Sequence, residues 1–256
     1  MSDPTEQPEP EERRYRFLNK DLIAAVARLD PAPRRQVWTS LSYCVIDAVW
    51  SIGATYSTVV APLVHRVADH NQDPAPLIES AYPLPDDPLP LEALLDRYPS
   101  TQHLCEVTNR QRTSPRGGIL KAEATLRYAT ILLDHGATDL TQTRALLDDA
   151  LWAADLDAAL VTVSGEGSYG VRRRYLWMLC GRDDVVKPDR MVLRWLKEKG
   201  LNLDPGTART VLCELAAEVT RQLGRPVTPW MVDHAIWLAA HPSRPGTASA
   251  SGCSPQ

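Results

Sequence analysis

The sequence predicts an all-α protein, and three observations lead to that prediction. Apolar residues recur every three or four positions along most of the chain, which is the spacing of one helix face. Strictly alternating apolar and polar runs, which are typical of strands, are almost absent. Pro, Gly and Asp separate the periodic segments from one another. With 256 residues, 44% of them hydrophobic and 23% charged, the composition is that of a globular protein with a sizeable core.

The first half of the chain predicts four helices. A helix over residues 20–29 ends at Asp30-Pro31, and a second over residues 38–52 carries apolar residues at helical spacing as far as Gly53. A third is expected at about 56–68. Residues 71–100 contain seven prolines, so we expect an irregular crossing segment with one short helix near 91–97.

The second half predicts further helices, and capping residues mark most of their ends. Gly136 is a C-terminal stop, while Asp204-Pro205 and Thr228-Pro229 place proline at the favoured first helical position. The expected helices cover residues 119–133, 141–148, 149–160, 171–180, 190–199, 205–223 and 229–240. We therefore expect one two-lobed helical domain over residues 15–241, of roughly ten helices without a repeat, between disordered tails at 1–14 and 242–256.

Composition also excludes several classes of protein. No apolar run approaches the roughly 18 residues of a membrane span, and the acidic, proline-rich N-terminus is unlike a secretory signal, so we expect a cytoplasmic protein. The five cysteines show no spacing typical of zinc or iron–sulfur ligands, and we expect no metal and no cofactor. We also expect a monomer. The net charge of −4 does not indicate a nucleic-acid-binding protein, although local charge decides where a polyanion binds.

The most informative stretch is the glycine-rich segment Ser164-Gly165-Glu166-Gly167-Ser168-Tyr169-Gly170 and the helix after it. Glycines at positions 165 and 167 allow a tight turn with positive φ. Such a turn, placed before a helix N-terminus, presents free backbone N–H groups that suit a phosphate. About twenty residues later, Asp189 stands at the start of another helix. The segment predicts a phosphate-binding hairpin followed by a single placed carboxylate.

This segment resembles the helix–hairpin–helix DNA glycosylases of the endonuclease III type. The resemblance is carried by VSGEGSYGV (163–171), LWMLCG (176–181) and VVKPDRMVLR (185–194), with WSIGATY (50–56) and ILKAEA (119–124) upstream. It covers about residues 35–200, and the motifs occur in the family's order. It implies a two-lobed helical fold with a cleft that binds double-stranded DNA and accepts one flipped nucleotide.

The resemblance also assigns roles to residues. Asp189 matches the catalytic aspartate, which would stabilise the sugar cation that forms as the N-glycosidic bond breaks, or orient a water molecule. The residues expected to bind DNA are Gly165, Gly167, Ser168, Tyr169, Gly170, Arg172, Arg173, Lys121, Lys187 and Arg190. Tyr169 stands where lysine-using members carry their nucleophile, and arginine forms no Schiff base. The resemblance therefore implies a monofunctional, hydrolytic N-glycosylase without strand cleavage. The family's cluster cysteines are missing, so no iron–sulfur cluster is expected.

Other interpretations of the same residues stay open. Gly53, Glu166 and Tyr169 depart from the family pattern and favour a DNA-binding protein on the same scaffold that has lost catalysis. The acidic charge alone would fit a helical protein-interaction module. Asp189 also has the position of a simple helix cap, and Arg172–Arg174 that of a solvated helix face. For Asp233 and His234, adjacent on the last helix, we expect a structural role, because neighbours in a helix point about 100° apart.

Overall fold

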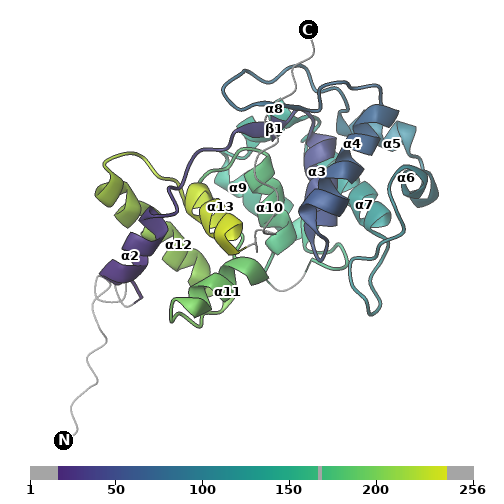
Figure 1. Ribbon diagram of the computed structural model, residues 1–256. Helices are drawn as coiled ribbons and strands as arrows, with labels where there is room; N and C mark the ends of the chain where they lie inside the picture. Colours follow the sequence, from purple (N-terminus) through teal and green to yellow (C-terminus); the bar gives the residue numbers. More distant parts are fainter. Residues whose placement is uncertain (1–16, 167–168, 241–256) are drawn as a thin grey trace, which may run out of the picture.

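The computed structural model describes residues 17–166 and 169–240. Within these residues it contains twelve α-helices, one π-helical turn and one small antiparallel sheet (Figure 1). The prediction of a mainly helical protein is confirmed. The tails expected at 1–14 and 242–256, and Gly167 and Ser168 of the hairpin, lie outside the described residues.

The helices follow the predicted segments closely, and polar caps fix most of their beginnings. Asn19, Ser40, Asp139 and Asp149 each accept a backbone N–H of the helix that they precede, which satisfies a donor without an intrahelical partner. The helices of the first half are α2 (Lys20–Ala27), α3 (Leu41–Ser51), η1 (Tyr56–Val60), α4 (Ala61–His70), α5 (Leu91–Arg97) and α6 (Thr101–Val107). Those of the second half are α7 (Lys121–Asp134), α8 (Leu140–Leu146), α9 (Ala150–Leu160), α10 (Val171–Leu179), α11 (Arg190–Glu198), α12 (Pro205–Leu223) and α13 (Pro229–Ala240).

Two local expectations were wrong. Residues Gln36–Trp38 form strand β1, which pairs antiparallel with β2 (Leu77–Glu79), whereas the sequence predicted a helix from residue 38 and no strand. The helix begins only at Leu41, because the Ser40 side chain caps it by accepting the Ser42 N–H. The second omission is α6, a short helix capped by Ser100; its seven residues give too few turns for a clear apolar period.

The helices form two groups, each with its own hydrophobic core. The larger core is built from β1 and α3 to α10, and in it α10 packs against α3. The smaller core joins the first described helix to the last three, since α2 packs against α12, and α13 packs against α11 and α12. Figure 1 shows α2, α11, α12 and α13 on one side of the molecule and α3 to α7 on the other. Because the chain leaves the smaller group after α2 and returns to it at α11, both ends of the described chain belong to one group.

Among the described residues, none of the helices combines the length and the apolar composition that crossing a membrane requires.

Candidate functional site

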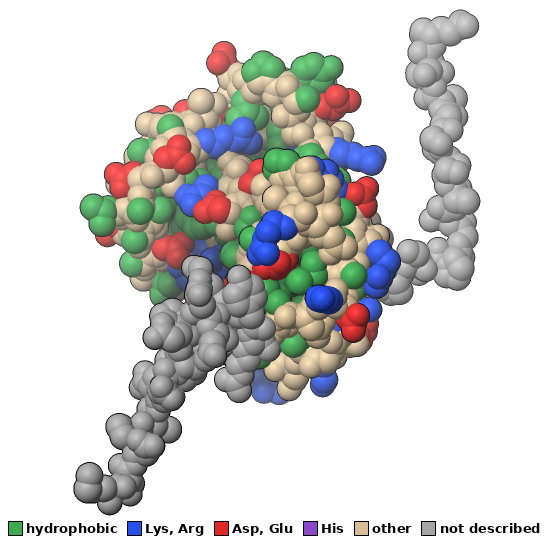
Figure 2. Space-filling model, turned by 90° about the vertical axis from the view of Figure 1, so that its left-hand side faces the viewer, with side chains coloured by type: hydrophobic (Ala, Val, Ile, Leu, Met, Phe, Trp, Pro, Cys, Tyr) green, Lys and Arg blue, Asp and Glu red, His purple; other side chains and the backbone are tan. Residues whose placement is uncertain are grey.

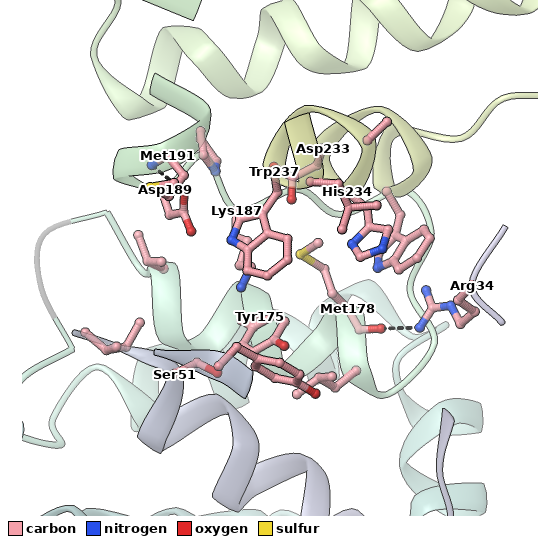
Figure 3. A pocket seen from close by; sticks show the side chains of 18 of the residues that line it. Arg34, Ser51, Tyr175, Met178, Lys187, Asp189, Met191, Asp233, His234 and Trp237 are labelled. Carbon is pink, nitrogen blue, oxygen red and sulfur yellow. Dashed lines mark hydrogen bonds between the residues drawn. The ribbon is translucent and has the colours of Figure 1, made fainter. Parts of the chain in front are cut away.

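A cleft of about 1820 Å³ lies between the two helical groups. It exceeds the roughly 300–1,000 Å³ of ordinary small-molecule pockets. The larger group supplies one wall through the end of α3, η1 and α10, and the smaller group supplies the other through α11, α13 and the segment before α11. Figure 3 shows side chains from both groups facing each other across it. The lining residues used below are Ser51, Tyr56, Tyr175, Asp189, Asp233 and Trp237.

Asp189 lies in this cleft and also caps α11. Its Oδ1 accepts the backbone N–H groups of Met191 at 2.8 Å and Val192 at 3.1 Å. The backbone of Asp189 is itself extended, with φ of −78° and ψ of −178°, so the helix begins directly after it. Figure 3 shows the carboxylate of Asp189 at the edge of the open space, with one oxygen directed at the helix. Capping therefore occupies one oxygen and leaves the other facing the cleft.

Lys187, one of the residues that the sequence predicted to bind DNA, lies in the cleft. Its Nζ lies 3.1 Å from the ring centre of Tyr175 in α10, so the side chain extends across the cleft from one helical group to the other. Burial lowers the pKa of this amine, while the neighbouring carboxylates of Asp189, Asp233 and Asp47 act in the opposite direction. Figure 3 shows Lys187 between Asp189 and Asp233. We therefore place Lys187 within the cleft and not among the surface cations.

Asp47 is a buried carboxyl group that binds three side chains next to the cleft. This carboxyl is fully buried in α3 and accepts the Trp38 indole N–H at 2.8 Å, the Tyr56 hydroxyl at 3.1 Å and the Ser51 hydroxyl at 2.8 Å. Burial raises its pKa, and these donors oppose the rise. Three donors on one carboxyl hold the aromatic side chains of β1 and η1 in fixed positions. Asp47 also contributes to the raised pKa of Tyr175.

Asp233 and His234 were expected to be structural, and the structure instead places both in the cleft wall on α13. Asp233 is 1% exposed, and its Oδ1 has no hydrogen-bond partner among the described residues. Burial raises its pKa to about 8. His234 stacks between Trp230, at 4.7 Å between ring centres, and Trp237, at 6.1 Å.

The hairpin before α10 is held by a buried carboxylate. Glu166 accepts the Arg173 backbone N–H at 3.2 Å and the Arg173 Nε at 2.9 Å, and it also binds the Tyr128 hydroxyl. Arg172 lies 3.7 Å from its other oxygen. Glu166 therefore points into the protein and anchors the turn.

Gly165 has the positive φ that was predicted for it, whereas Gly167, the other glycine of that prediction, lies outside the described residues. Gly165 has φ of 86° and Gly170 of 63°. A Cβ on Gly165 would lie 2.4 Å from the Cβ of Thr113, so glycine is required there for space as well as for conformation. Gly170 directly precedes α10, and the contact at Gly165 packs the hairpin against the loop before α7.

Two predicted DNA-binding residues lie inside the protein. Arg172 is 1% exposed and donates to the Gly165 carbonyl at 2.6 Å. Lys121 is 2% exposed and donates to the carbonyls of Trp50 and Ile52, each at 2.8 Å. Burial lowers the Lys121 pKa to about 8. Because both cations satisfy carbonyl groups inside the fold, neither reaches a phosphate on the surface.

The other predicted contacts differ in exposure. Tyr169 is 49% exposed, and Arg190 is exposed at the cleft. Arg173 is mostly buried, because its guanidinium is shared between Glu166 and Asp157. On the side of the molecule drawn in Figure 2, Lys and Arg side chains alternate with Asp and Glu and do not form one continuous basic field.

The cleft offers charged and aromatic groups but no cluster of metal ligands. Within residues 17–166 and 169–240, no group of three or more His, Cys, Asp or Glu side chains could hold a metal ion. Comparison with protein-family models identifies the family of the chain. A model of a domain of unknown function (DUF8548) matches residues 19–241. The chain belongs to this family. No curated protein and no solved structure matches it. The match to DUF8548 covers both helical groups and the cleft between them.

Proposed function

We propose that this DUF8548 domain is a two-lobed fold of the helix–hairpin–helix glycosylase type, and that it removes a base from double-stranded DNA by hydrolysis. The observation that carries the proposal is Asp189. Its carboxylate caps α11 through one oxygen and lies in a cleft between two separately packed helical groups. A cleft of this volume has room for a nucleotide turned out of a duplex, at a cost of a few kcal/mol in unstacking.

The position of Asp189 suits it to stabilise the sugar cation and to orient a water molecule. Breaking the bond between C1′ and the base nitrogen leaves positive charge on the sugar, and a carboxylate fixed at a few ångströms stabilises that charge. The two backbone N–H groups that donate to Asp189 hold it in a single orientation and support its negative charge. The same carboxylate orients the water molecule whose oxygen then attacks C1′. The products are the free base and an abasic site.

The experiment measures base release from duplexes that carry uracil, hypoxanthine, an oxidised purine or an alkylated base, with alkali cleavage to reveal abasic sites. Asp189→Asn keeps the helix cap, because Asn caps helices as well as Asp does, but it removes the charge. We expect this variant to release base at least about 100-fold more slowly than the wild-type protein.

Asp204 supplies a matched control. It caps α12 in the same way, accepting the N–H groups of Gly206 at 2.8 Å and Thr207 at 3.1 Å, and it does not line the cleft. Asp204→Asn should therefore leave base release unchanged. If the wild-type protein releases no base from any duplex but binds DNA in a salt-dependent manner, the domain is a DNA-binding protein without this activity. Absence of binding at low salt would refute both interpretations.

A further inference from the structure

The wall of the cleft that carries Asp189 also contains a second carboxyl group, Asp233 of α13, that the hydrolysis described above does not use. Asp233 is almost completely shielded from bulk water, yet it borders the cleft, and its Oδ1 has no hydrogen-bond partner among the residues that the structure describes. An unpaired buried carboxyl oxygen costs stability. The simplest explanation is that a polar group of a bound substrate forms a hydrogen bond with this oxygen.

Burial keeps Asp233 neutral, although the ammonium group of Lys187 favours its ionised form. Lys187 and Asp189, both on the segment before α11, are the charged groups that act on it, and Asp189 opposes its ionisation. Asp189 is only partly buried and accepts two backbone N–H groups. Asp233 is almost completely buried and one of its oxygens has no donor among the described residues, so Asp233 retains its proton. Two carboxyl groups held in different protonation states by their surroundings are the arrangement that acid–base catalysis uses.

The surroundings of Asp233 also fit a flat ring. Trp230, His234 and Trp237 lie on the same face of α13, and the rings of His234 and Trp237 are within 9° of parallel. Tyr56 approaches Trp237 edge-on at 6.4 Å from the other helical group. Figure 3 shows the aromatic rings of α13 beside Asp233 along one wall of the cleft. A planar base that stacks on these rings would bring its polar edge to the carboxyl of Asp233.

We propose that Asp233 is a second catalytic residue, which donates its proton to the departing base while Asp189 stabilises the sugar. This inference rests on the proposed glycosylase function. As the bond between C1′ and the base nitrogen breaks, its electron pair goes to the base, and the Asp233 proton neutralises the base at a ring nitrogen or carbonyl oxygen. Water adds its oxygen to C1′ and gives its proton to Asp189, and that proton returns to Asp233 to complete the cycle.

The experiment compares two leaving groups in single-turnover assays. A neutral base needs a proton to depart, whereas 7-methylguanine is already cationic and departs without one. For Asp233→Asn we expect release of the neutral base to fall at least about 100-fold, and release of 7-methylguanine to change less than about threefold. With the neutral base, the wild-type rate should fall as pH rises above about 8, and the variant should lose this dependence.

The possible results separate the acid role from the glycosylase proposal. If Asp233→Asn slows both bases equally, Asp233 is structural and the acid role is refuted while the glycosylase function stands. The acid role is also refuted if Asp233→Asn releases the neutral base at the wild-type rate. The same holds if the wild-type protein releases only the cationic base. Absence of release of any base by the wild-type protein refutes the glycosylase function and the acid role together. Asp204→Asn serves again as the control for loss of a carboxylate outside the cleft.

Discussion

Replacing Asp233 by Asn should stabilise the folded protein at neutral pH and have almost no effect near pH 4. The pKa of Asp233 is raised from 3.8 to about 8 by burial. Between these pH values the folded chain holds one more proton than the unfolded chain, so the free energy of unfolding falls as pH rises through this window. Asn is neutral in both states and avoids this loss.

The magnitude follows from the same pKa difference. At pH 7 the unfolded carboxyl is about three pH units above its pKa and the folded one is still protonated, which amounts to about 4 kcal/mol of lost stability in the wild-type protein. Because Asp233 is 1% exposed, solvent screening removes little of this. We take about 4 kcal/mol as the upper limit of the stabilisation by Asp233→Asn, since local relaxation around an ionised Asp233 reduces it.

Urea unfolding at about pH 4, pH 5.5 and pH 7 measures this difference directly. The free energy of unfolding of the variant should exceed that of the wild-type protein by an amount that grows with pH. Asp204→Asn changes a solvated cap and should show no such gain. A difference between Asp233→Asn and the wild-type protein that is the same at all three pH values would refute the assignment of a protonated Asp233.

Two further predictions concern the hairpin. Replacing Glu166 by Ala should lower the free energy of unfolding by about 3–5 kcal/mol, because Arg172 is left as a buried cation without a carboxylate and Arg173 keeps only Asp157. Urea unfolding measures this loss, and a value below about 1 kcal/mol would contradict the pairing. Gly165→Ala should lower the thermal midpoint more than Gly224→Ala does. Both glycines have positive φ, but only a Cβ at position 165 meets another residue within 4 Å, so equal losses would contradict the steric argument.

Local signals explain why most of the helices could be predicted from the sequence. Asp204-Pro205 and Thr228-Pro229 mark helix starts through the proline and the residue before it, and α12 and α13 begin at those prolines. The β1–β2 sheet has no comparable local signal. Trp38 is extended because it pairs with Leu77, which lies about forty positions away, and a three-residue strand is too short to show an alternating pattern.

The candidate site could be predicted only in part, for a related reason. Asp189 was identified because its cap position and its neighbours in the sequence mark it directly. The position of Asp233 in the cleft depends on how α13 packs against α11, and no local pattern contains that information. Arg172 was misassigned because an exposed arginine and one buried beside Glu166 look the same in sequence. The opposite charge of Glu166, six positions earlier in the sequence, was the only indication that Arg172 is buried in an ion pair.

The division of roles between the two carboxyl groups depends on Lys187. Its ammonium group is held on the Tyr175 ring at 3.1 Å, which fixes a single positive charge between Asp189 and Asp233. Removing that charge would raise the pKa of Asp233 further, because Lys187 is the nearby cation that favours its ionised form. In the proposed mechanism, this placement keeps the Lys187 cation beside Asp189 while Asp233 holds the proton that the base receives. Because Tyr175 belongs to the larger helical group and Lys187 to the smaller one, this balance is present only when the two groups are packed as they are here.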